Sequence, residues 1–250
     1  MAFSWAGDLS GANPVVRRVQ VAADCYQGQL LIWDLNAGGL VEPITVGGAG
    51  PDATSQVAGI CSAVVTSPSY DSTYRGDKAT YDVTQAALEA NDPVGPTTVD
   101  MILVTPTTLI KAPIVRTTIG TSLLRQACTT GSNDGLTFIV PTIDTSVSDF
   151  STAYCYDGAN RGQYRKVTTG AVATQTFVIP FTYDIAVGDK FVVANVREGY
   201  AHIDFDSQFQ GINGIDSLSS SWWAAYVHEI NLEEAGKEYA VFQLSTRHLL

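Results

Sequence analysis

Charged side chains are scarce in this sequence, which has 14 Lys and Arg and 25 Asp and Glu among 250 residues. They make up 16% of the chain, against roughly 25% in a typical soluble protein. The formal net charge is −11, and Lys and Arg form no cluster. Because nucleic-acid binding requires clustered cations to neutralise phosphates, we exclude nucleic acid as a partner. The low charge favours a surface partly covered by other proteins, although β-proteins rich in Thr and Ser share this composition.

Long apolar runs are also absent. No window approaches the ~18 consecutive apolar residues of a membrane-spanning helix. The first 16 residues, MAFSWAGDLSGANPVV, lack the basic start and apolar core of a signal peptide. We therefore expect no membrane segment, and we expect synthesis in a reducing cytoplasm.

Cysteines are few, and their spacing does not suggest a metal site. Four occur, at positions 25, 61, 128 and 155, with no C-x-x-C pair and no His at ligand spacing. This pattern predicts no zinc site. Each Cys stands in an apolar context, which predicts buried free thiols; disulfides are the alternative.

Catalytic motifs are missing as well. There is no G-x-S-x-G nucleophile turn and no H-E-x-x-H pair, and we expect His202, His228 and His248 to be solvated or packed. Asp204 and Asp206 would share the wet face of one strand. We interpret them as surface residues, with a general acid–base pair or Ca²⁺ ligands as the alternative.

The glycine-rich stretch at 47–50 lacks the Lys-Ser/Thr and the following helix of a phosphate-binding loop. The sequence therefore predicts no catalytic residue, no metal ligand and no cofactor-binding residue. We expect that the protein is not an enzyme.

What the sequence does contain is a series of short runs rich in Val, Ile, Thr, Phe and Tyr, bounded by Gly, Pro and Asp. Such runs are typical of β-strands. We predict strands over 19–22, 29–33, 40–46, 57–66, 79–83, 99–105, 107–110, 136–140, 163–167, 174–181, 190–193, 202–209, 222–232 and 239–245. Little helix is expected, the best helical turn being 84–90. The predicted fold is all-β, with two β-barrel or β-sandwich bodies.

We divide the chain into a flexible N-terminal arm (1–18), a first β body (19–112) and a second β body (113–250). The boundary follows from Pro106 and Pro113, which favour an extended connection. Phe3 and Trp5 leave the arm with aromatic side chains to bury. They are expected to dock either on the protein's own core or on a neighbouring chain.

Further aromatic residues complete a predicted interface. Tyr70 and Tyr74 lie in a polar loop, and Trp222 precedes Trp223. Since side chains alternate along a strand, we expect Trp223 to point inward and Trp222 to lie at a contact. The predicted interface residues are Phe3, Trp5, Tyr70, Tyr74 and Trp222. For the loop of Tyr70 and Tyr74 and for the tryptophan pair, stacking on a glycan is the alternative.

Several stretches resemble the decoration (cement) proteins of tailed bacteriophage heads. They are GQLL at 28–31, VAGI at 57–60 and GD at 76–77, with the turns NRGQ at 160–163 and AVGD at 186–189. The shared features are short strands, many Thr and Gly residues, and few charged residues. It implies a homotrimer that binds the major capsid protein on the outer surface of a virion and stabilises the shell. A tail or baseplate component and a carbohydrate-binding β module are the alternatives.

Overall fold

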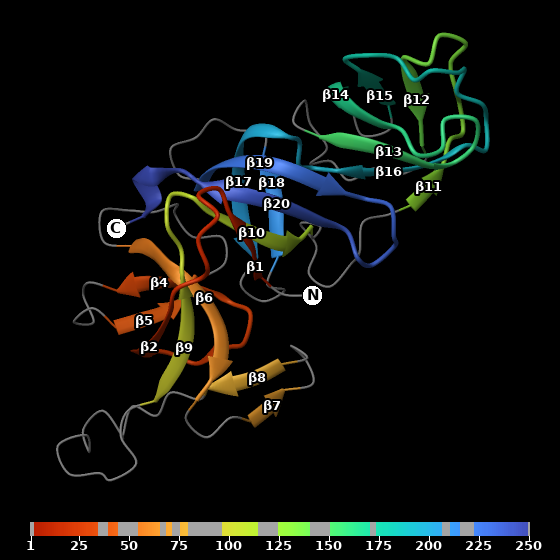
Figure 1. Ribbon diagram of the computed structural model, residues 1–250. Coiled ribbons are helices and arrows are strands. Elements are labelled where there is room, and N and C mark those ends of the chain that lie inside the picture. The colour runs from red at the N-terminus through yellow and green to blue at the C-terminus, as the bar shows by residue number, and fades with distance from the viewer. Residues whose placement is uncertain are drawn as a thin grey trace, which may run out of the picture. The chain divides into compact units, whose positions relative to one another are not determined.

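A computed structural model describes eleven stretches of the chain: 3–34, 40–44, 55–65, 69–71, 76–79, 97–114, 125–140, 151–170, 174–206, 211–215 and 223–249. The fold is all-β, as the sequence predicts, and its sheets are antiparallel (Figure 1). Thr246–His248 form one turn of 3-10 helix. Within these stretches no helix is long and apolar enough to cross a membrane. The helical turn predicted at 84–90 lies outside them.

The chain forms two compact units. Unit 1 comprises residues 1–112, 205–211 and 243–250, and unit 2 comprises 113–204 and 212–242. The second body expected from the sequence was a single continuous stretch from 113 to the end. In the structure the chain instead returns to unit 1 twice, because part of a late strand and the C-terminal segment pack there.

In the described part of the chain, the first ten strands belong to unit 1, except for Pro113 at the end of β10. They are β1 (Ser4–Asp8), β2 (Val16–Gln20), β3 (Cys25–Tyr26), β4 (Leu30–Asp34), β5 (Leu40–Pro43), β6 (Ser55–Val64), β7 (Ser69–Asp71), β8 (Gly76–Ala79), β9 (Thr98–Leu103) and β10 (Thr108–Pro113). Five of them form a sheet in the order β2-β9-β6-β4-β5, and three form a small sheet in the order β3-β8-β7. β1 pairs with β10.

The five-stranded sheet of unit 1 closes into a small barrel. Val21, just after β2, forms a parallel bridge with Val41 of β5, and the Ala22 amide donates to the Val41 carbonyl at 2.8 Å. The two edge strands therefore meet. Small and medium apolar side chains fill the interior, namely Val21, Cys25, Leu31, Val41, Ala58, Cys61, Val64, Val99 and Met101. Closure pairs the two edges of this sheet with each other.

The predicted N-terminal arm docks on its own chain, one of the two alternatives that the sequence left open. Residues 4–8 form β1, a strand that the sequence did not predict because Gly7 interrupts its alternation. Ser4 and Trp5 lie opposite Lys111 and Ile110 of β10. Residues 16–18, also assigned to the arm, begin β2.

Unit 2 contains a second barrel of six strands. These are β11 (Arg125–Ala127), β12 (Thr137–Ile139), β13 (Thr152–Asp157), β14 (Tyr164–Gly170), β15 (Thr174–Phe177) and β16 (Lys190–Ala194), in the order β11-β16-β13-β14-β15-β12. The edges meet because Thr129 and Thr130, which follow β11, donate to the Ile139 carbonyl in β12. Figure 1 shows these six strands gathered together.

Stacked phenylalanine rings fill the six-stranded barrel. Phe138 is fully buried, with its ring centroid 4.4 Å from that of Phe191 and 5.4 Å from that of Phe177. Phe181 meets Phe177 edge-on at 4.9 Å. Burial of four aromatic rings gives this short-stranded barrel a large apolar core.

Unit 2 also holds most of a group of four strands in the order β20-β19-β17-β18. Their bounds are β17 (Gly199–Asp206), β18 (Gly211–Ile215), β19 (Trp223–Asn231) and β20 (Tyr239–Leu244). Along β19, Trp223, Ala225 and Val227 are buried, whereas Tyr226 and His228 are exposed. The predicted inward direction of Trp223 is confirmed.

Candidate binding surface

Two tyrosines and a histidine form a continuous aromatic surface on β17 and β19, which we call the tyrosine surface. Tyr200 of β17 lies directly opposite Tyr226 of β19. Their ring centroids are 5.2 Å apart with the planes at 89°. The His228 ring lies 4.9 Å from that of Tyr226. The spacing of 226 and 228, two residues apart on one strand, places both on the same face.

The tyrosine surface is unusually open to solvent. Tyr200 is 82% exposed, the highest value among the large hydrophobic side chains that the structure describes, and Tyr226 is 42% exposed. The edge-to-face ring geometry fixes the two side chains relative to each other. Exposed aromatic side chains held in this way present apolar area and hydroxyl groups at a small cost in side-chain entropy when a ligand binds.

Only part of the tyrosine surface could be predicted from the sequence. Tyr226 and His228 follow from the alternation along β19, but the strand containing Tyr200 was predicted to begin at residue 202. Gly199 adopts a φ of +102°, and such a glycine ordinarily marks a turn. Tyr200, two residues before the predicted start of this strand, was therefore not predicted to lie on the exposed face of β17.

Of the five predicted interface residues, the structure describes the side chains of two, Phe3 and Trp5. Phe3 is 4% exposed, with its amide donating to the Gly28 carbonyl at 2.9 Å, so it belongs to the core of its own chain. Its place beside β1 explains this burial. Trp5 is half-buried on β1. Tyr70 lies on β7, but its side chain is outside the described part of the chain, as are Tyr74 and Trp222.

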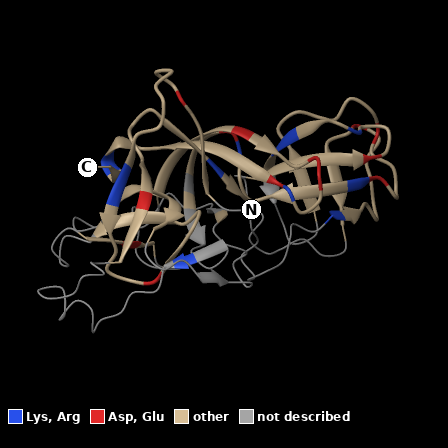
Figure 2. Ribbon diagram, turned by 60° about the horizontal axis from the view of Figure 1, so that its bottom comes forward, with Lys and Arg blue, Asp and Glu red and all other residues tan. Residues whose placement is uncertain are grey.

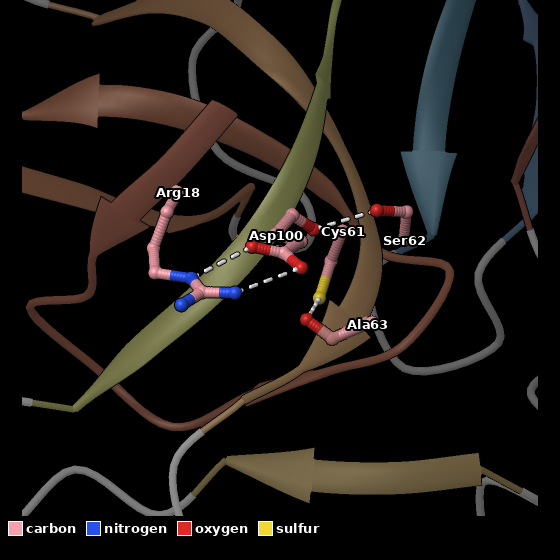
Figure 3. Close-up of polar contacts among 5 residues, drawn as sticks. All are labelled: Arg18, Cys61, Ser62, Ala63 and Asp100. Carbon is pink, nitrogen blue, oxygen red and sulfur yellow. Dashed lines mark hydrogen bonds and ion pairs between the residues drawn. The ribbon is translucent and has the colours of Figure 1, made fainter. Parts of the chain in front are cut away.

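One polar cluster of unit 1 is structural in character (Figure 3). Arg18 of β2 lies opposite Asp100 of β9, and its Nε and Nη2 donate to the two carboxylate oxygens at 3.0 and 3.4 Å. The Ser62 hydroxyl donates to the Asp100 carbonyl at 2.8 Å. The bonds to Asp100 raise the pKa of Arg18. Because the pair is largely exposed, it contributes little stability and offers no reactive group.

The polar loop at 157–162 is likewise held together internally. Asn160 is fully buried. Its Nδ2 donates to the Tyr183 carbonyl at 3.0 Å, and its Oδ1 accepts from the Tyr183 amide at 2.9 Å. Gly158, at φ +118°, packs against Asp189. These contacts tie the loop to the turn before β16, and they account for its Gly and Asn without a ligand.

Titratable side chains do not gather into a reactive site in the parts of the chain given above. No group of three or more His, Cys, Asp and Glu among those residues is placed to hold a metal ion. His228 is exposed, whereas His248 is buried and accepts from Arg247 Nε at 3.0 Å. The side chains of His202, Asp204 and Asp206, and residues 47–50, lie outside the described part.

A small hollow in unit 2 has a volume of about 120 Å³ and is lined by Thr152, Tyr164, Arg165, Lys166, Glu198 and Ile230. Typical sites for drug-sized ligands are roughly 300–1,000 Å³. Lys166 Nζ donates to the Glu198 carbonyl at 3.4 Å. The hollow is therefore too small to bury a metabolite, and its basic groups are partly engaged.

The tyrosine surface is thus the best candidate for function. Comparisons of the chain with protein-family models, with curated proteins and with solved structures gave no match.

Proposed function

We propose that the protein is a virion structural protein, a decoration protein that binds the outer surface of a major capsid shell and stabilises it. The observation that carries the proposal is the tyrosine surface, formed by Tyr200, Tyr226 and His228. Tyrosine is enriched among the residues that dominate the energy of protein interfaces. An exposed aromatic cluster on a rigid sheet is suited to this role.

The charge distribution supports a protein partner. In the described part of the chain, Figure 2 shows acidic and basic residues as short, separate coloured segments of the ribbon, with no long run of one sign. The net charge of −11 disfavours contact with packaged nucleic acid and suits an outer surface. The resemblance of the stretches at 28–31, 57–60 and 160–163 to decoration proteins points in the same direction.

The mechanism is added interface area. A specific protein contact buries roughly 1,200–2,000 Å². When a decoration subunit bridges two capsid subunits, internal pressure can separate those subunits only by breaking this additional interface. The tyrosine surface is smaller than this, so it would form the centre of a larger contact. Closed rings are the usual form of self-association, and we propose a homotrimer.

Carbohydrate binding is a second candidate function, and the same surface favours it. Exposed tyrosine rings stack on the apolar faces of sugars, and their hydroxyl groups donate and accept hydrogen bonds. The steep angle of 89° between Tyr200 and Tyr226 offers no single flat platform, which makes a protein contact the stronger proposal.

The location of the protein tests the proposal. Particles would be purified from a lysate of the cells in which the protein is naturally produced. They would be analysed by mass spectrometry and labelled with gold-conjugated antibody against this chain. Label spread over the head is the expected result. Label confined to the tail would replace the proposal by the tail or baseplate alternative. Absence from particles, together with retention on a polysaccharide column, would favour the carbohydrate-binding module.

A further inference from the structure

Two of the four cysteines lie together in the core of the five-stranded barrel. Cys25 is in β3 and Cys61 in β6, and their exposed fractions are 0% and 1%. Both belong to one cluster of packed core side chains. Along the chain they are 36 positions apart (61 − 25), so the fold rather than the sequence brings them together.

The backbone around the two cysteines explains their proximity. The Gln29 amide donates to the Tyr26 carbonyl at 3.1 Å, which closes a tight turn directly after Cys25. Gly28 in this turn has a φ of +80°. The Gly28 amide donates to the Cys61 carbonyl at 2.7 Å, and the Cys61 amide donates to the Gln29 carbonyl at 2.9 Å. The turn after Cys25 is therefore bonded to the backbone of Cys61 on both sides.

The two side chains also meet. Both thiols belong to the same packed core cluster, and the neighbouring Cys25 thiol, followed by burial, raises the pKa of the Cys61 thiol. Cys61 Sγ additionally lies 4.0 Å from the Ala63 carbonyl oxygen (Figure 3). Two thiols in one core cluster, carried by segments that share backbone hydrogen bonds, are candidates for a disulfide, which requires their Cα atoms to lie within about 7 Å.

The other two cysteines provide an internal comparison. Cys128 Sγ lies 3.0 Å from the Thr130 carbonyl oxygen, and Cys155 Sγ lies 3.3 Å from that of Asp157. Burial is the main cause of the raised pKa of each thiol. They occupy the core of the six-stranded barrel as separate buried thiols.

We propose that Cys25 and Cys61 are a redox pair that forms an intramolecular disulfide between β3 and β6 when the protein meets a disulfide oxidant such as oxidised glutathione. One cysteine thiolate attacks a glutathione sulfur, and a glutathione thiolate leaves. The second cysteine thiolate then attacks the protein sulfur of this mixed disulfide and releases the second glutathione. Two protein thiols are oxidised, one glutathione disulfide is reduced, and the two protons pass to solvent or to the departing thiolates.

The surrounding structure indicates how the oxidant would reach Cys25 and how the cross-link would affect stability. β3 has two residues and β7 three, and so small a sheet opens more readily than the barrel. Opening there would admit the oxidant to Cys25. The cross-link would close the loop that carries β4 and β5, and constraining a loop of this length in the unfolded state stabilises the folded one.

The test uses the full chain, unfolded in urea and refolded in glutathione buffers of increasing oxidised fraction at about pH 8.5, where thiolates form. Refolding makes every thiol accessible. We expect a loss of mass equal to two hydrogen atoms, a single linked peptide pair containing Cys25 and Cys61, and a melting temperature raised by about 10 °C over the reduced protein.

The variant Cys128→Ser/Cys155→Ser should oxidise like the wild type, and Cys25→Ala should acquire no intramolecular link. The inference is overturned if the wild type remains fully reduced, carries only mixed glutathione disulfides, or links the cysteines without preference among the possible pairs. Because the wild-type peptide map alone distinguishes these outcomes, the test does not depend on a variant that folds poorly.

Discussion

Replacing Arg125 by methionine should destabilise unit 2 strongly, because it leaves a buried carboxylate without its cation. Arg125 of β11 and Glu238, just before β20, form an ion pair with Nη2 3.3 Å from Oε1. Their side chains are 14% and 3% exposed. Arg125 also donates to the Leu232 carbonyl and lies over the Tyr156 ring, 4.9 Å from its centroid.

The expected cost follows from this burial. Breaking a buried ion pair by removing one partner costs about 3–5 kcal/mol, because the remaining charge stays desolvated. Glu238→Gln should cost about 1–2 kcal/mol, since its amide oxygen still accepts from Arg125 but without the carboxylate charge. The double variant Arg125→Met/Glu238→Leu should be more stable than Arg125→Met alone, because no uncompensated charge remains.

Urea-dependent hydrogen exchange in β19 and β20 measures these changes locally. The Leu232 amide is a direct reporter, since it donates to Tyr164 Oη at 3.0 Å. Lys237→Met is the control. It breaks an exposed pair with Glu234, whose side chains are 63% and 65% exposed, and should change stability by less than about 0.5 kcal/mol. An Arg125→Met protein as stable as this control would refute the reasoning.

Three other predictions concern unit 2. Asn160→Ala should destabilise unit 2 by about 2–4 kcal/mol in urea unfolding. The buried Asn160 side chain hydrogen-bonds both the backbone N–H and the carbonyl of Tyr183, and the substitution leaves both without this partner. Gly158→Ala should lower the melting temperature more than Gly162→Ala. Both glycines have positive φ, but only at Gly158 would the added Cβ meet a neighbour, 2.2 Å from Asp189 Oδ1; equal effects would contradict this difference. Burial raises the pKa of Tyr154, Tyr156 and Tyr164, so absorbance at 295 nm should show these phenols ionising above about pH 10. Because the pKa values are higher in the folded protein than in the unfolded chain, folding favours the neutral phenols. The contribution to the free energy of unfolding is therefore fully present below about pH 10 and is lost as the pH rises through the pKa values of the folded protein.

Much of the fold could be predicted from the sequence because short strands with one buried face have a clear period of two. The strand predicted at 99–105 is found at Thr98–Leu103, and the one at 190–193 at Lys190–Ala194. The predicted burial of the four thiols is confirmed, and no disulfide joins them. Their apolar neighbours in sequence were sufficient for that inference.

The sequence left open whether each body is a barrel or a sandwich, since barrel closure depends on contacts between segments far apart along the chain. The bridge from Val21 to Val41 and the bonds from Thr129 and Thr130 to Ile139 leave no local signature. The pairing of Tyr200 with Tyr226 has the same origin, since strand register across a long connection is set by packing. The aromatic residues predicted to form an interface were at the N-terminus, in a loop and next to Trp223, whereas Tyr200 and Tyr226 lie on β17 and β19.

The most direct test of the proposed function is attachment of tyrosine variants to the particle. Tyr200→Ser/Tyr226→Ser and the single variant Tyr183→Ser would be added to particles lacking the protein, and bound protein measured by co-sedimentation. Tyr183 is also exposed, at 59%, but lies outside the tyrosine surface. Loss of two interface tyrosines should weaken attachment at least about 30-fold, corresponding to 2 kcal/mol or more, whereas Tyr183→Ser should bind like the wild type. Equal attachment of all three proteins would contradict the proposal.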